Sequence, residues 1–64
     1  MTLRIINSKL IKLAEYKPKN QNLIIYYQNG EKFEAVNVPV SVFEDLISAR
    51  DVDNYYLENI KSKY

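Results

Sequence analysis

Apolar and polar positions alternate through the first two thirds of the chain in the way that β-strands require. Residues 10–16 mix aliphatic and polar side chains, residues 23–28 form a β-branched and aromatic run, and residues 31–38 resume the alternation. Side chains of these types fit a pleated, half-buried surface. The pattern therefore predicts three strands, at 10–16, 23–28 and 31–38.

Two turn segments separate these strands. Residues 17–22 contain Pro18, which fixes φ, inside a polar cluster that has nothing to bury. Asn29 and Gly30 directly follow the second strand, and Gly30 is the only glycine in the chain. A two-residue type I′ turn needs positive φ at both central positions, which Asn and Gly tolerate. We therefore expect an antiparallel meander with a tight hairpin at Asn29-Gly30.

The period of two also predicts which face of the sheet meets the core. Alternate residues of the second and third strands are apolar and point the same way; they are Leu23, Ile25, Tyr27, Phe33 and Ala35. We expect this set to form the core face. Tyr26 then lies on the opposite, more polar face.

The pattern changes to helical spacing after Val38-Pro39, because the residue before a proline is held extended and proline is tolerated at a helix start. Ser41 and Glu44 match a capping box, in which each side chain satisfies the other residue's backbone amide. Apolar residues then recur at helical spacing; they are Val42, Phe43, Leu46, Ile47 and Ala49. The segment predicts a first helix.

Residues 50–53 interrupt that stripe, and either Asp51 or Asp53 can cap a second helix. The apolar residues expected on its buried side are Tyr55, Tyr56, Ile60 and Tyr64. These elements predict a single α+β domain over residues 1–64. Its fold is a three-stranded antiparallel meander followed by two short C-terminal helices packed on one face.

Composition excludes several kinds of chemistry. The chain has no cysteine and no histidine, which removes thiolate nucleophiles, imidazole bases and Cys/His zinc sites. A calcium loop starting at Asp51 fails, because Tyr56 and Ser62 occupy the places that need Gly and Glu. Spacing alone leaves a Ser8/Lys12 pair open, but a nucleophilic serine also needs a base held within hydrogen-bond reach. We expect a non-catalytic protein without metal or cofactor.

Charge is unevenly spread although the net charge is +1. Residues 1–20 carry five basic side chains against one acidic, residues 21–60 carry two against seven, and the tail adds Lys61 and Lys63. No apolar run is long enough to span a membrane. We expect a cytoplasmic protein, in the host cytoplasm if a phage encodes it.

Lysines interleaved with tyrosines can hold single-stranded nucleic acid, since ammonium groups pair with phosphates and rings stack on bases. The candidate nucleic-acid-binding residues are Lys9, Lys12, Tyr16, Lys17, Lys19, Tyr26, Lys61, Lys63 and Tyr64. Other roles stay open for some of them. Lysines at a helix end complement the helix dipole on any protein, and Tyr16 and Tyr64 can also close the edge of the core.

An ordered set of motifs over nearly the whole chain resembles the KTSC domain, a small family named for its fusion to the C-terminus of lysyl-tRNA synthetases. The residues that match the family pattern are Ser8, Tyr16, Gly30, Phe33, Val38, Pro39, Ala49, Tyr55, Tyr56 and Ile60. Other positions depart from it: Asn7, Lys17, Ala35 and Leu57 replace a serine, an aspartate, an aromatic and an asparagine, and Asp51 and Asp53 replace a serine and a glycine. One extra residue between Leu10 and Tyr16 predicts a β-bulge.

The resemblance implies an accessory module associated with RNA or other nucleic acid, present also in phage and mobile-element proteins. Two hypotheses follow. The first is a small non-catalytic module that binds RNA or single strands through its lysine and tyrosine surface. The second is a protein-interaction module, either a homodimer or a phage-encoded modulator of a host protein, because the net charge is near neutral and tyrosines are enriched at interfaces.

Overall fold

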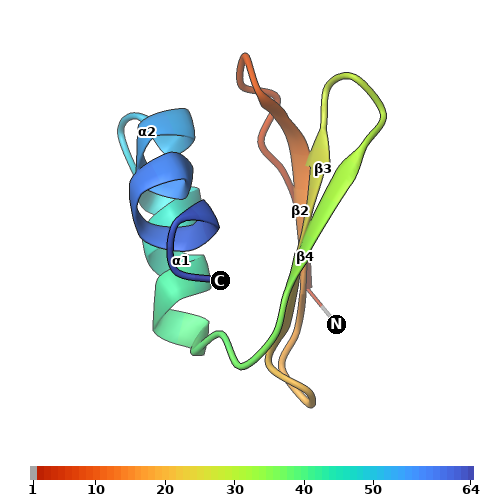
Figure 1. The fold of residues 1–64 in the computed structure, drawn as a ribbon, viewed down its shortest axis with the longest axis vertical. Coiled ribbons are helices and arrows are strands. Elements are labelled where there is room, and N and C mark those ends of the chain that lie inside the picture. Colours follow the sequence, from red (N-terminus) through yellow and green to blue (C-terminus); the bar gives the residue numbers. More distant parts are fainter. Residues whose placement is uncertain (1) are drawn as a thin grey trace.

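The structure is a computed structural model that describes residues 2–64, and it has two layers, a sheet and a pair of helices that cover one face of it (Figure 1). The sheet is antiparallel, with its strands in the order β1-β2-β3-β4. The strands are β1 (Thr2–Ile5), β2 (Ile11–Lys17), β3 (Asn22–Tyr27) and β4 (Lys32–Ala35). The helices are α1 (Val40–Ser48), α2 (Val52–Tyr56) and a π-helical segment, η1 (Leu57–Lys61), that continues α2. The α+β class and the two C-terminal helices are confirmed.

The sheet has four strands, so the predicted three-stranded meander is wrong by one strand. The additional strand is β1, which pairs with β2 from Thr2 opposite Tyr16 to Ile5 opposite Leu13. It is only four residues long, and its apolar side chains, Leu3 and Ile5, point away from the helices and are 50% and 78% exposed. Its polar and apolar residues do alternate, but over only four residues, the shortest run in which alternation indicates a strand.

The other three strands lie where the pattern predicts, with shifted ends. β2 and β3 each differ by one residue, and the anticipated bulge lies between Ile11 and Leu13, where Lys12 is the extra residue. β4 is shorter than the predicted 31–38. The chain turns at Asn37, which has a φ of 57°, and the Val38 amide then donates to the Gln21 carbonyl at 2.8 Å.

The hairpin between β3 and β4 has a three-residue loop rather than the predicted type I′ turn. Gly30 has a φ of 94°, whereas Asn29 does not have positive φ. The Gly30 amide donates to the Tyr27 carbonyl at 3.2 Å and the Tyr27 amide donates to the Glu31 carbonyl at 2.8 Å. This is the pattern of a turn closed by a left-handed glycine and a bulge. Asn29 stays out of the left-handed region because its side chain accepts from the Glu31 amide at 2.9 Å.

The core lies between the helices and the face of the sheet that the period of two predicts. Leu23, Ile25 and Ala35 are buried, and Tyr27 and Phe33 are half-buried against the same cluster. The helices contribute residues that are almost entirely buried; they are Phe43, Leu46, Tyr56 and Ile60. Tyr64, expected on the buried side of the second helix, is exposed.

The helix starts differ in how they are capped. The predicted capping box at Ser41 and Glu44 is wrong, because α1 begins at Val40 with Pro39 as its N-cap and no side chain caps it. Ser41 is therefore already inside the helix. Asp51 does cap α2, accepting from the Asn54 amide at 3.1 Å. Asp53, at a position where the family has glycine, lies within α2 and does not have positive φ.

Candidate functional site

The strand register places a mixed set of side chains on the face of the sheet that the helices leave open. One row across the strands consists of Ile5, Leu13, Tyr26 and Lys32, and the next consists of Leu3, Glu15, Ile24 and Glu34. Within residues 2–64 no helix lies over this face (Figure 1). The open face therefore presents side chains from all four strands side by side without a helix over them.

Four of the predicted lysines follow β2 and its two flanking loops along the long axis of the molecule. Lys9 lies in the loop before β2, Lys12 in the bulge, Lys17 at the last position of β2, and Lys19 in the turn that follows. The two loops lie at opposite ends of the molecule (Figure 1), whose longest extent is 28 Å. We call Lys9, Lys12, Lys17 and Lys19 the β2 track.

Tyr26 lies beside this track. It pairs with Leu13 of β2 and is half-buried, and its hydroxyl donates to Glu15 Oε1 at 3.5 Å, a long hydrogen bond. Part of the ring is therefore available to a ligand on the open face. Lys32, which is not among the predicted binding residues, is exposed and lies opposite Tyr26 on β4. The strand alternation places Lys32 on the open face, but Lys32 lies outside the basic first third of the chain from which most of the candidate lysines come.

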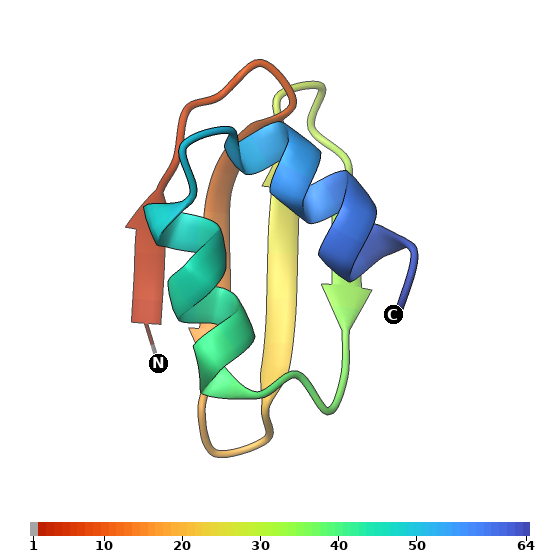
Figure 2. The same ribbon diagram turned by 90° about the vertical axis from the view of Figure 1, so that its left-hand side faces the viewer.

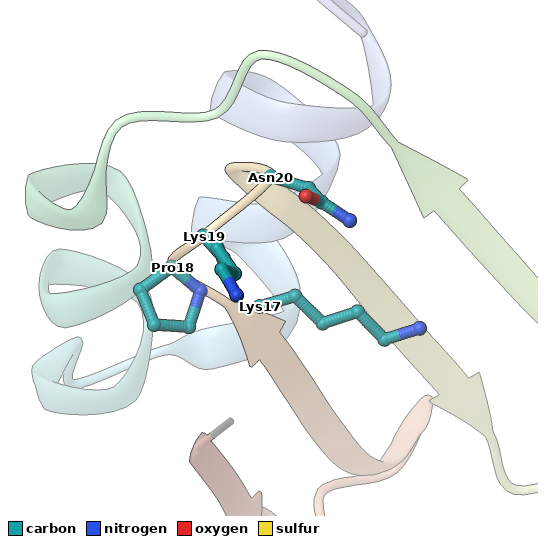
Figure 3. Close-up of a pocket in the computed structure, with 4 residues that line it drawn as sticks. All are labelled: Lys17, Pro18, Lys19 and Asn20. Carbon is teal, nitrogen blue, oxygen red and sulfur yellow. The ribbon is translucent and has the colours of Figure 1, made fainter.

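The lower end of the track surrounds a shallow hollow of about 350 Å³ at the turn between β2 and β3. Figure 3 shows the four residues that line it, Lys17, Pro18, Lys19 and Asn20. Pro18 holds the turn in shape because its ring fixes φ. In the same view the Lys17 side chain extends away from Pro18 and Lys19, so the two ammonium groups do not converge on one point.

Tyr16 does not belong to this surface. Its side chain is 2% exposed, stacks on Phe43 with ring centroids 5.2 Å apart, and donates its hydroxyl proton to the Val38 carbonyl at 2.6 Å. A ring held in this way cannot stack on a base. Of the two roles that the sequence leaves open for Tyr16, the structure supports the core role.

The basic tail also lies apart from the track. Lys61, Lys63 and Tyr64 are exposed, and the C-terminus lies on the helical side of the sheet beside β4 (Figure 2). The N-terminal lysines and the tail lysines therefore do not share one face. The nine candidate residues separate into the β2 track with Tyr26, the tail, and buried Tyr16.

The residues of the family pattern are mainly structural. Gly30 closes the hairpin, Val38 is buried, Pro39 caps α1, Ala49 follows α1 as its C-cap, and Tyr56 and Ile60 are buried in the core. Phe33 packs edge-on against Tyr56 at 5.8 Å, and Tyr55 is half-buried. These positions maintain the packing of the two layers.

Ser8 makes a link that the sequence pattern does not reveal. Its hydroxyl donates to Asp53 Oδ1 at 2.6 Å and accepts from the Ile11 amide at 3.0 Å, so that it joins the first loop to α2. The Tyr27 and Tyr56 hydroxyls form a second link between sheet and helix. Burial and this hydrogen bond raise the pKa of Tyr56 far above its usual range, and burial also raises the pKa of Tyr55.

No group of acidic side chains in the described part of the chain is arranged to hold a metal ion. No helix among residues 2–64 combines the length and apolarity needed to cross a membrane. What the site offers is a set of cations, a partly exposed ring and apolar side chains on an open sheet. Such a surface can bind a ligand through charge, stacking and apolar contact.

Comparison with known proteins agrees with the fold. A family model described as the KTSC domain matches residues 7–64. Among solved structures, the chain is similar to a crystal structure of a KTSC domain protein from Yersinia pestis, with a TM-score of 0.89 and 22% identity over 97% of this chain and 87% of that chain. No curated protein matches the chain. At this identity the structural likeness establishes the fold, and β1 lies before the segment that the family model matches.

Proposed function

The chain belongs to the KTSC domain family, and we propose that it is a non-catalytic binding module that holds single-stranded nucleic acid on the open face of its sheet. The observation that carries the proposal is the β2 track, four lysines in a line along one strand and its loops with Tyr26 beside them. Single strands are held by this combination of a basic path and a stacking ring.

Charge along the track favours an anionic polymer. Residues 9–19 carry the four lysines against one acidic residue, Glu15, a net charge of +3 in a chain whose total is +1. Glu15 accepts only a long hydrogen bond from Tyr26, at 3.5 Å, and Glu34 lies in the same row of this face. A strand lying along β2 would place its phosphates near the lysines and a base near the Tyr26 ring.

Salt dependence of binding tests the proposal. With four lysines on phosphates, log affinity for a single-stranded oligomer should fall against log salt with a slope of about −3, since each contact contributes about 0.7. The measurement is fluorescence anisotropy with RNA and DNA oligomers of about ten nucleotides, a length within the usual site size of small single-strand-binding folds. No binding at about 50 mM salt, or a flat salt response, contradicts the proposal.

A paired set of variants locates the contact. Lys12→Ala with Lys17→Ala removes half of the track and should reduce the slope to about −1.5. Lys61→Ala with Lys63→Ala removes the same charge from the helical side and should leave the slope unchanged. Equal effects of the two double variants would mean that charge alone, and not its position on β2, governs binding.

A protein partner is the second candidate function, favoured by a separate observation. Leu3 and Ile5 are 50% and 78% exposed on the same face, next to Leu13. Exposed apolar side chains at the edge of an open sheet favour contact with another protein. A cytoplasmic location and a phage or mobile-element origin, both suggested by the sequence, stay predictions.

A further inference from the structure

The free edge of β1 has unpaired backbone groups. The Ile6 amide donates to the Lys12 carbonyl at 3.0 Å, and these two residues continue the β1–β2 register. Hydrogen-bonded pairs alternate along an antiparallel ladder, so Arg4 also bonds to β2, whereas the N–H and C=O groups of Leu3 and Ile5 point out of the sheet. The strand therefore has donors and acceptors at an open edge.

The two edges of the sheet differ in how they are protected. On β4, the outward positions Lys32 and Glu34 are charged and exposed. On β1, the corresponding positions are Leu3 and Ile5, which are apolar and exposed. Charged side chains on an edge strand oppose pairing with another chain, whereas an apolar edge favours it. Only the β1 edge has both unpaired backbone groups and apolar side chains.

We propose that a second copy of this chain pairs with β1, antiparallel and about a two-fold axis, to form one continuous eight-stranded sheet. A two-fold interface requires a surface that complements itself, and an antiparallel strand edge meets this requirement. The helices of both copies stay on the same side of the joined sheet, and both open faces lie on the other side.

Charge selects the register of this pairing. A two-fold axis at Arg4 would place the two arginines directly opposite each other, and like charges in that position are unfavourable. An axis at Leu3 places each Arg4 opposite Thr2 of the other copy, and Leu3 opposite Leu3 in a hydrogen-bonded pair. The first register joins Leu3 to Ile5 of the other copy but places the cations opposite each other. The second joins the two Leu3 side chains and separates the cations, so the Leu3-centred pairing is the one we infer.

The size of the contact sets its strength. Specific interfaces bury at least about 1,200 Å² in total, about 600 Å² per partner, while this chain exposes 4293 Å². A strand of four residues with the exposed parts of Leu3 and Ile5 supplies less than that. The pairing should therefore be reversible and depend on protein concentration.

The second copy would also double the nucleic-acid-binding surface formed by the β2 track and Tyr26. This consequence rests on the proposed function, whereas the pairing of the two β1 strands does not. In the joined sheet the two β2 tracks run antiparallel on one face. Three strand spacings, about 14 Å, separate them. Two tracks on one face would bind a longer or folded-back strand more tightly than a single copy does.

Sedimentation equilibrium of the full chain without nucleic acid tests the pairing. The average mass should rise from 7.6 kDa towards twice that value as the protein concentration increases to about 1 mM. Leu3→Lys places two cations opposite each other at the two-fold axis and should keep the mass at that of the single chain. Val36→Lys, at an exposed valine away from β1, should leave the association unchanged. A constant single-chain mass for the wild type overturns the inference, and so does equal association of Leu3→Lys.

A disulfide tests the register, because the chain has no cysteine of its own. Leu3→Cys should give a covalent dimer on mild oxidation, since hydrogen-bonded positions lie about 5.5 Å apart between Cα atoms. Ile5→Cys should not, because in this register its two copies lie about 13 Å apart along the strands. A covalent dimer of Ile5→Cys in place of Leu3→Cys overturns the Leu3-centred pairing. If the protein stays a single chain and still binds the single-stranded nucleic-acid oligomer, the pairing is wrong and the proposed function stands.

Discussion

The two faces of the sheet come from the same strands and yet differ in almost every physical property. On the covered face, Leu23, Ile25 and Ala35 are buried beneath the helices. On the open face, apolar Leu3 and Ile5 are exposed among charged neighbours. Since successive side chains of a strand point to opposite faces, each strand serves both faces at once. A chain of 64 residues can thereby place its stability on one face and its contacts on the other.

The difference also explains where hydrogen bonds between distant segments lie. Tyr16 of β2 donates to the Val38 carbonyl in the segment before α1, and Ser8 in the loop before β2 donates to Asp53 of α2. On the open face, the corresponding contact is the long Tyr26–Glu15 bond at 3.5 Å. The covered face is therefore fixed by its own partners, whereas the open face leaves its side chains free for an external one.

The largest expected effect is loss of folding from a change on the covered face. Leu46 is completely buried, so Leu46→Ala should cost about 2–5 kcal/mol. A domain of this size has roughly 3–5 kcal/mol of stability, so the variant should be largely unfolded at 25 °C. Urea denaturation followed by circular dichroism measures the change.

Ile5→Ala is the matched change on the open face. Its side chain is 78% exposed, so its free energy of unfolding should differ from that of the wild type by less than about 0.5 kcal/mol. A loss for Ile5→Ala as large as that for Leu46→Ala would mean that both faces contribute to the core, and the separation of roles would be wrong.

A smaller effect is expected on binding from the ring on the open face. Tyr26→Ala should weaken binding of a single-stranded oligomer by about 1–3 kcal/mol, roughly 5- to 150-fold, because it removes the ring on which one base stacks. Tyr26→Phe keeps the ring and should bind as the wild type does. Tyr64→Ala, on the helical side, should also have no effect. Anisotropy titrations at fixed salt measure all three, and unchanged affinity of Tyr26→Ala would count against stacking.

The smallest effect concerns the two helix starts. Asp51→Ala removes the side chain that accepts from the Asn54 amide and should cost about 1 kcal/mol. Ser41→Ala should cost less than about 0.5 kcal/mol, because Ser41 does not cap α1. Thermal denaturation compares the two variants. A larger loss for Ser41→Ala would restore the capping box that the sequence pattern predicts.

Local sequence patterns predict the covered face well, because buried positions are occupied by apolar residues at the period of the strand or helix. Alternation in residues 23–28 identifies the core side of β3, and helical spacing identifies Phe43 and Leu46. The family pattern also predicts a bulge between Leu10 and Tyr16, and the strand register has it at Lys12. In each case the side chains that fill the core determine the local pattern, so the sequence alone is informative.

The open face is harder to predict, because exposed positions are under no such constraint. β1 alternates over only four residues, and alternation does not tell which side of a strand faces the core. The lysines separate into two groups only when the strands are placed in three dimensions. Alternation does place Tyr26 on the open face, whereas the sequence leaves two roles open for Tyr16, which is buried.

The most direct test of the central claim is a titration followed by nuclear magnetic resonance. Backbone amide chemical shifts are mapped while a single-stranded oligomer of about ten nucleotides is added at about 50 mM salt. Changes should concentrate on Lys12, Lys17, Lys19 and Tyr26 and leave the amides of α1 nearly unchanged. Changes confined to the helices and to Lys61 and Lys63, or an unchanged spectrum at saturating oligomer, would contradict the assignment of binding to the open face.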